Sequence, residues 1–170
     1  MKNLRTKSLI IFVLFISLPF STFAESASSR KSKSTEVNKI QDTQKAFEYF
    51  ETELNFKTNA YFINRAIKEK MPNINIIDVR SAEAFRKGHI PGAINIPSEK
   101  HSGFEGNETD IPGLRKDAFN CIYCYSATCN LSQKAAKKFA SLGYPVKEIA
   151  GGYKAWIEEY KFPVETYPTK

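Results

Sequence analysis

Cysteine is scarce in this sequence and occurs in a single place. The 170 residues contain three cysteines, Cys121, Cys124 and Cys129. Disulfides that stabilise small exported domains join distant segments, and cysteines confined to one short stretch cannot form such a framework. An odd number also leaves at least one thiol unpaired. The fold therefore has to rest on a hydrophobic core, and the cysteines are candidates for chemistry.

Long apolar runs are also missing, apart from a short one near the start. A membrane-spanning helix needs about 20 apolar residues, whereas the run over 9–18 is shorter and Pro19 interrupts it. Three basic residues come before this run: Lys2, Arg5 and Lys7. Small residues then lead up to Ala24, in the layout of a cleaved secretory signal peptide. We expect residues 1–24 to direct export, to the periplasm or outside the cell, and the mature protein to have no stable membrane span; a retained anchor is the alternative.

Clustered charge is the third feature that the main part of the chain lacks. The formal net charge is +7, but residues 1–40 hold seven basic and two acidic side chains. The remainder is therefore close to neutral and shows no basic stripe, which argues against a nucleic-acid partner. The Ser- and Lys-rich stretch 25–40 has almost no apolar residue, and we interpret it as a flexible linker.

From about residue 41 the sequence has the periodicity of one globular domain. Helices are predicted over 42–54, 59–70, 81–85, 131–142 and 153–160, and strands over 74–79, 93–96, 120–123 and 145–149. This alternation predicts a mostly parallel sheet with helices on both faces. Ligand sites of such sheets lie beyond the carboxyl ends of the strands. The loop that follows 120–123, beside the cysteines, is therefore the candidate site.

Three segments resemble the signatures of the rhodanese-like family. The first is Ile77–Arg80 with Gly88–Asn95, the second is Tyr123-Cys124 before a loop and an Ala-rich helix, and the third is Gly151–Trp156. They appear in the family's order and spacing. The residues of this structural signature are Asp78, Arg80, His89, Gly92, Gly151, Gly152 and Trp156.

The resemblance implies both a fold and an activity. The fold would be a three-layer α/β/α domain over residues 57–165, with a central, mostly parallel five-stranded sheet, preceded by a helical extension over 41–56. The activity would be sulfur transfer, in which Cys124 takes sulfane sulfur from a small donor, holds it as a persulfide and passes it to an acceptor. The acceptor would be a thiol, a cyanide-like nucleophile or a protein, and no cofactor is implied.

The residues after Cys124 fit this chemistry in part. A thiolate, not a thiol, attacks sulfur, so we expect the pKa of Cys124 to be lowered by loop amides and by the dipole of the helix from Leu131. The amides of Tyr125, Ser126, Ala127, Thr128 and Asn130 would bind the anion. Asn130 and Gln133 have the spacing of a capping box for that helix. The alternative for Cys124 is a small buried hydrophobic residue at a strand end.

The loop also departs from the common form of the family. It has no Gly and no basic residue between Cys124 and Leu131, which removes a charge-assisted contact worth on the order of 1.5–3 kcal/mol to an anionic donor. We therefore expect thiosulfate to be a poor substrate, and a phosphatase activity is disfavoured. The loop resembles a subgroup with the pattern Tyr-Cys-Tyr-x-x-x-Cys. Cys129 would then be either a thiol that resolves an oxidised Cys124 as a disulfide, or a packing residue.

The other candidate residues are predicted to be structural. Cys121 should face the side of the sheet opposite Cys124 and stay inert. The three cysteines do not form a convincing metal site, because a strand separates two of them and no histidine lies nearby in sequence. Asp78 and Arg80 would pair, with Glu83 as a further partner. His89 would bond backbone, and Tyr153 and Trp156 would pack in the core. Tyr125 would border the pocket or point outward.

Three functions remain open at this stage. The first is the sulfurtransferase using Cys124. The second is a thiol oxidoreductase or redox sensor using the pair of Cys124 and Cys129. The third is a noncatalytic module that keeps the fold and binds a partner.

Overall fold

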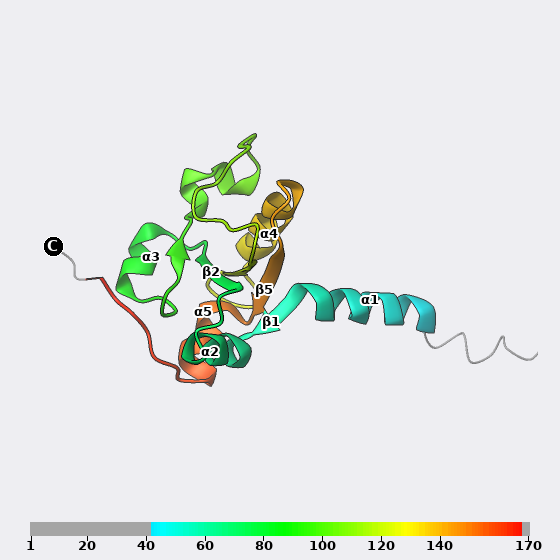
Figure 1. Cartoon of the computed structure of the whole chain (residues 1–170), viewed down its shortest axis with the longest axis horizontal. Helices are drawn as coiled ribbons and strands as arrows, with labels where there is room; N and C mark the ends of the chain where they lie inside the picture. The colour runs from blue at the N-terminus through cyan, green and yellow to red at the C-terminus, as the bar shows by residue number, and fades with distance from the viewer. Residues whose placement is uncertain (1–41, 168–170) are drawn as a thin grey trace, which may run out of the picture. The chain divides into compact units, whose positions relative to one another are not determined.

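The computed structural model describes residues 42–167 of the chain (Figure 1). The predicted signal peptide over 1–24 and the predicted linker over 25–40 lie outside these residues. Within residues 42–167, no helix is both long and apolar enough to cross a membrane.

A five-stranded sheet forms the centre of the domain, as predicted. Its strands are β1 Lys57–Asn59, β2 Ile74–Asp78, β3 Ile94–Asn95, β4 Phe119–Tyr123 and β5 Val146–Ala150. Their order across the sheet is β1-β5-β4-β2-β3, and every neighbouring pair is parallel. All five carboxyl ends therefore meet at one edge, and β4 lies in the middle of the sheet.

The helices begin where the sequence offers side chains that cap them. They are α1 Thr43–Phe56, α2 Ala60–Lys68, α3 Ala82–Lys87, α4 Leu131–Ser141 and α5 Gly152–Lys154, which continues as a π-helical turn over Ala155–Glu159. Two short 3-10 turns, Ser98–Lys100 and Ser102–Phe104, interrupt the long loop before β4. Side chains of Asp42, Asn59 and Ser81 accept hydrogen bonds from the first turns of α1, α2 and α3, which satisfies amides that have no partner inside the helix.

Helices cover both faces of the sheet, so the three-layer arrangement is confirmed (Figure 1). On one face, Ile63 of α2 and Trp156 pack against Cys121 and Tyr123 of β4. On the other face, α4 packs Ala135 and Phe139 against the strand residues Ile77 and Ile122. Successive residues of β4 alternate between these two clusters because strand side chains alternate with a period of two.

Two elements differ from the prediction. Strand β1 was not predicted, because its residues are the polar Lys57, Thr58 and Asn59, which carry no strand-like apolar pattern; it forms at the sheet edge by pairing with β5. Helix α1 forms as predicted, but none of its residues is buried. Its amphipathic pattern therefore does not bury a core face within the described residues.

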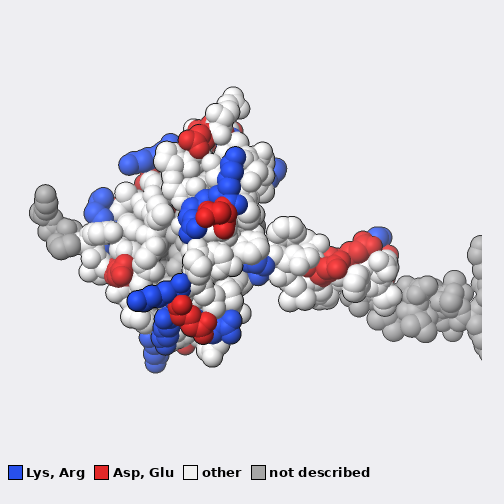
Figure 2. Space-filling view, viewed as in Figure 1, with Lys and Arg blue, Asp and Glu red and all other residues white. Residues whose placement is uncertain are grey.

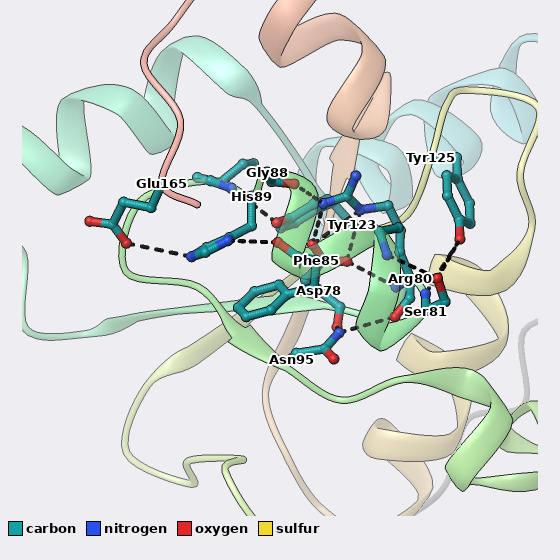
Figure 3. A network of polar contacts seen from close by, with 12 residues as sticks. Asp78, Arg80, Ser81, Phe85, Gly88, His89, Asn95, Tyr123, Tyr125 and Glu165 are labelled. Carbon is teal, nitrogen blue, oxygen red and sulfur yellow. Dashed lines mark hydrogen bonds and ion pairs between the residues drawn. The ribbon is translucent and has the colours of Figure 1, made fainter. Parts of the chain in front are cut away.

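A buried ion pair fixes the end of β2 (Figure 3). The Arg80 guanidinium contacts both oxygens of Asp78, with Nη2 2.6 Å from Oδ2, and it donates to the carbonyl of Gly88 at 2.7 Å. The side chains are 3% and 0% exposed. Burial acts to lower the pKa of Arg80, but the hydrogen bonds and charge of Asp78 raise it on balance. The guanidinium also lies 3.8 Å from the ring centre of Tyr153, so this pair connects two separate signatures.

The expected contact of Arg80 with Glu83 is wrong. Glu83 lies in the first turn of α3 and forms an exposed ion pair with Lys87 at 2.7 Å. The i, i+4 spacing on the helix surface brings these two side chains together. His89 behaves as predicted, with Nδ1 2.9 Å from the carbonyl oxygen of Phe85 (Figure 3).

Asp78→Ala tests the importance of this pair. We expect it to reduce the free energy of unfolding by about 3–5 kcal/mol, because Arg80 would remain buried without its counter-charge. Urea unfolding of the full chain measures this loss. The control is Glu83→Gln, which breaks an exposed, solvent-screened ion pair and should leave the free energy of unfolding almost unchanged. Equal losses in the two variants would contradict the structural role assigned to Asp78.

Candidate active site

Cys124 lies directly after the last residue of β4, at the carboxyl edge of the sheet. Its side chain is 1% exposed and packs in the cluster that includes α4. Cys121 packs in the opposite cluster, as predicted, and burial raises its pKa to about 12. Of these two thiols, only Cys124 therefore borders the loop between β4 and α4.

The Gly151-Gly152 turn holds this loop in place. The amides of Tyr153 and Lys154 donate to the carbonyls of Cys124 and Tyr125, each at 2.9 Å. Gly152 has a φ of +60°, and a Cβ at this position would lie 2.7 Å from the Cys124 carbonyl oxygen and 3.0 Å from the Ser126 nitrogen. The third signature therefore needs glycine here for close backbone contact as well as for its conformation.

The sulfur of Cys124 has both acceptors and donors around it. It lies 3.2 Å from the carbonyl oxygen of Cys129 and 3.7 Å from Oγ of Ser132. The backbone amide of Ser132, in the first turn of α4, acts on the same sulfur and lowers the pKa of the thiol. The carbonyl favours the neutral thiol, whereas the amide favours the thiolate.

The expected lowering of the Cys124 pKa is wrong. Burial raises this pKa, the neighbouring Cys129 side chain raises it further, and the backbone amide of Ser132 opposes the rise without cancelling it. Loss of water around a charged sulfur thus outweighs the helix-terminal amide. A buried thiol of this kind needs a proton acceptor before it can attack.

The predicted capping box of α4 is also wrong. Asn130 occupies the N-cap position, but its side chain makes no capping hydrogen bond. Its backbone has φ −90° and ψ 3°, whereas capping side chains usually extend from a β-type backbone. The first turn of α4 instead acts on Cys124, because the Ser132 amide lowers the pKa of that thiol.

The loop residues expected to bind an anion are only partly gathered around the sulfur. Cys129 donates its amide to the Ser126 carbonyl at 3.1 Å, and the hydroxyls of Ser126 and Thr128 lie 3.1 Å apart. The Tyr125 side chain points outward, is 44% exposed and brings its hydroxyl to 3.4 Å from Oγ of Ser81 (Figure 3). Ala127 lines the small cavity described below.

A cavity of about 120 Å³ lies beside the loop, lined in part by Ser126, Ala127, Ser132 and the Gly151-Gly152 turn. Two charged residues also line it, Lys57 from β1 and Glu148 from β5. The Ser132 hydroxyl donates to Glu148 Oε1 at 2.7 Å. The site therefore gains a cation and a carboxylate from strands that lie outside the loop.

Sequence reasoning missed Lys57, Ser132 and Glu148 as site residues. Lys57 was missed because β1 was not predicted. Glu148 carried one available signal, a carboxylate inside a predicted strand beside the central one. Its contact with Ser132 depends on how α4 packs against β5, which no local pattern reveals.

All three cysteines are free thiols in the structure. In the range 42–167, no three His, Cys, Asp or Glu side chains converge as metal ligands would. Acidic and basic side chains are interspersed on the face shown in Figure 2, without a single basic patch. The chemistry of this site therefore centres on the Cys124 sulfur and the groups that contact it.

Comparison with known proteins identifies the family. The sequence model described as Rhodanese-like domain matches residues 58–159, which is more than half of the chain. The chain therefore belongs to the rhodanese-like family. Its Asp78–Arg80 pair, its Cys124 loop and its Gly151-Gly152 turn all lie within the matched region.

Relatives and solved structures agree with this family. The chain is 34% identical over 92 residues to thiosulfate sulfurtransferase GlpE of Pseudomonas putida, covering 54% of this chain and 74% of that protein. It is 32% identical over 88 residues to GlpE of Shewanella oneidensis, covering 51% and 78% respectively. The crystal structure of the BH2092 protein from Bacillus halodurans superposes with a TM-score of 0.64 at 36% identity, covering 74% of this chain and 87% of that one.

Gly152→Ala tests the contact between the glycine turn and the Cys124 loop. The control is Gly143→Ala, because Gly143 also has positive φ, at +81°, but nothing lies within 4 Å of an added Cβ. The left-handed conformation alone costs roughly 1–2 kcal/mol for a non-glycine residue, so we expect Gly143→Ala to lose about that much stability and Gly152→Ala to lose clearly more. Urea unfolding measures the free energy of unfolding of both variants. Equal losses would show that the close contact between Gly152 and the Cys124 loop does not require glycine.

Proposed function

We propose that this chain is an exported sulfurtransferase that carries sulfane sulfur as a persulfide on Cys124. The observation that carries the proposal is the position of the Cys124 sulfur, at the end of the central strand and in contact with the first turn of α4. Membership of the rhodanese-like family and similarity to proteins named thiosulfate sulfurtransferase support it.

The reaction would proceed in two displacements. The Cys124 sulfur attacks the outer sulfur of the donor, a new S–S bond forms, and the donor's own bond to that sulfur breaks with its electron pair leaving on the donor remnant. For thiosulfate, the remnant is sulfite. A nucleophilic acceptor, such as a thiol or cyanide, then attacks the terminal sulfur of the persulfide and restores the Cys124 thiolate.

The surroundings suit a sulfur that carries negative charge. The Ser132 amide reaches the sulfur, and backbone amides at a helix N-terminus favour anions. The loop itself has no basic residue, but Lys57 lines the adjacent cavity. Lys57 is therefore the candidate cation for an anionic donor, in a position that sequence reasoning did not foresee.

A redox role for Cys124 and Cys129 is the second candidate, favoured by one observation. The two cysteines interact closely enough for Cys129 to raise the pKa of Cys124. The Cys129 thiolate would attack the inner sulfur of a Cys124 persulfide, form a disulfide and release hydrosulfide. This step balances without an added oxidant.

Sulfur loading distinguishes these functions. The purified full chain is incubated separately with thiosulfate, mercaptopyruvate and glutathione persulfide, and intact mass is measured. We expect a gain of one sulfur atom, located on Cys124, absent in Cys124→Ser, and released as thiocyanate by cyanide. Cys129→Ser is the matched control in the same loop and should still load.

Other outcomes of this experiment assign the other functions. A loss of two hydrogens without added sulfur, dependent on both cysteines, would show the redox function instead. No mass change with any of the three donors would contradict both reactions and favour a module that only binds a partner.

Export is the second part of the proposal and rests on the first 24 residues. We expect the chain produced in a bacterial host to be recovered outside the cytoplasm, with Glu25 as its first residue. N-terminal sequencing of the recovered protein measures this. A chain that still begins at Met1 and remains in the cytoplasm would contradict it.

A further inference from the structure

The Cys124 sulfur is linked to a carboxylate by a single intervening hydroxyl. Oγ of Ser132 lies 3.7 Å from the sulfur, and the same hydroxyl lies 2.7 Å from Oε1 of Glu148. Cys124 and Ser132 are 1% and 3% exposed, so water has little access to the first contact. Three residues from β4, α4 and β5 thus form one continuous chain of polar atoms.

The direction of the hydrogen bonds in this chain is defined by chemistry. A carboxylate can only accept, so the Ser132 hydroxyl donates its proton to Glu148. With its own proton directed to Glu148, Ser132 Oγ can act only as the acceptor in its contact with the sulfur. The Cys129 carbonyl at 3.2 Å accepts from the same thiol, but a carbonyl has no proton of its own to pass on, so only the Ser132 hydroxyl can relay the proton to a carboxylate.

We propose that Glu148 acts, through Ser132, as the proton acceptor that converts the Cys124 thiol into the attacking thiolate. This inference deepens the proposed sulfur transfer and rests on it. Burial and Cys129 both raise the pKa of Cys124, so few thiolates exist at neutral pH without such assistance. Glu148 does not contact the reacting sulfur and is therefore a positioning residue.

The proton and electron movements balance without any added reagent. The S–H bond breaks as its proton moves to Ser132 Oγ, and the hydroxyl proton of Ser132 moves to the Glu148 carboxylate. The electron pair left on sulfur attacks the donor sulfur, and the pair of the broken donor bond leaves with the donor remnant. Glu148 lines the 120 Å³ cavity, so its new proton passes to solvent or to the leaving group there.

The charged group beside Glu148 is Lys57 on β1, which Glu53 on α1 contacts in turn. Lys57 pairs with Glu148 in sheet register and forms an ion pair with Glu53 at 2.6 Å. On the other side, the neighbour in β4 is the apolar Ile122. The hydrogen bond to Glu53 and the charge of Glu148 both raise the pKa of Lys57, so the ammonium persists across neutral pH and keeps a positive charge beside the carboxylate.

Alkylation of Cys124 by iodoacetamide tests the relay without any sulfur donor. Iodoacetamide needs a thiolate but no donor site, so the outcome is independent of whether the protein transfers sulfur. The rate of Cys124 modification is followed from about pH 6 to pH 10 in the full chain, with the site located by fragment-ion mass spectrometry. The variants are Glu148→Gln and Ser132→Ala. The control is Glu69→Gln, which changes an exposed residue at the C-cap of α2.

We expect Glu148→Gln to react about 100-fold more slowly than the native chain near pH 7, the size of effect that a general base usually supplies. The difference should vanish near pH 10, where hydroxide removes the proton directly. Ser132→Ala should behave alike, and the double variant should be no slower than either single one, because all three break the same relay. The Glu69→Gln control should match the native chain.

Two results would overturn the proposal. The first is a Glu148→Gln rate that equals or exceeds the native rate near pH 7, which means that the carboxylate acts only through its negative charge. The second is a slowing that stays constant at every pH, which means that the substitution only disturbs the structure. Glutamine keeps an oxygen that can accept from Ser132, and thermal unfolding of each variant shows whether the fold is retained.

Discussion

The burial of one sulfur atom is the constraint on which this site depends. Cys124 ends the central strand, and its side chain enters the core that α4 covers. Packing there excludes water, which protects a reactive sulfur but also raises the pKa of the thiol. A protein that uses this sulfur has to provide a way to remove its proton and to hold the negative charge that follows. The Ser132 amide meets the second need, and the contact between Ser132 and Glu148 offers a means of meeting the first.

The three family signatures work as one structure around this sulfur. The Asp78–Arg80 pair of the first signature stacks on Tyr153 of the third. The same third signature, through Gly152 and the amide of Tyr153, contacts the carbonyl of Cys124. The first signature therefore contacts the third, and the third contacts the Cys124 loop, although the three segments are distant along the chain. This explains physically why a glycine pair and a buried arginine accompany the cysteine.

Much of this arrangement could be predicted from sequence, where local patterns decide the structure. Apolar periodicity and capping residues such as Asn59 and Ser81 located the helices, and strict alternation correctly placed Cys121 and Cys124 on opposite faces. Prediction failed where contacts between segments distant in sequence decide the structure. Strand β1 forms only because β5 offers it a partner. The lowered pKa of Cys124 was expected from loop amides and the helix dipole, since the degree of burial is not visible in a motif.

The site residues divide in the same way. Cys124 follows from its motif, whereas Glu148 lies on β5, beside the central strand, and Lys57 lies on the edge strand β1; their place at the site depends on how α4 and β1 pack against β5. The absence of a basic residue in the loop is real, but it does not mean that the site lacks a cation nearby. Loop composition alone is thus a poor guide to the charge of a site that several strands line.

The pattern of initial rates tests the central claim most directly. Thiocyanate formation is measured with thiosulfate and cyanide varied independently. A sulfur carried on Cys124 predicts parallel double-reciprocal lines, because the donor remnant leaves before the acceptor binds. Intersecting lines would mean that both substrates must be bound together, and they would contradict a covalent sulfur carrier at Cys124.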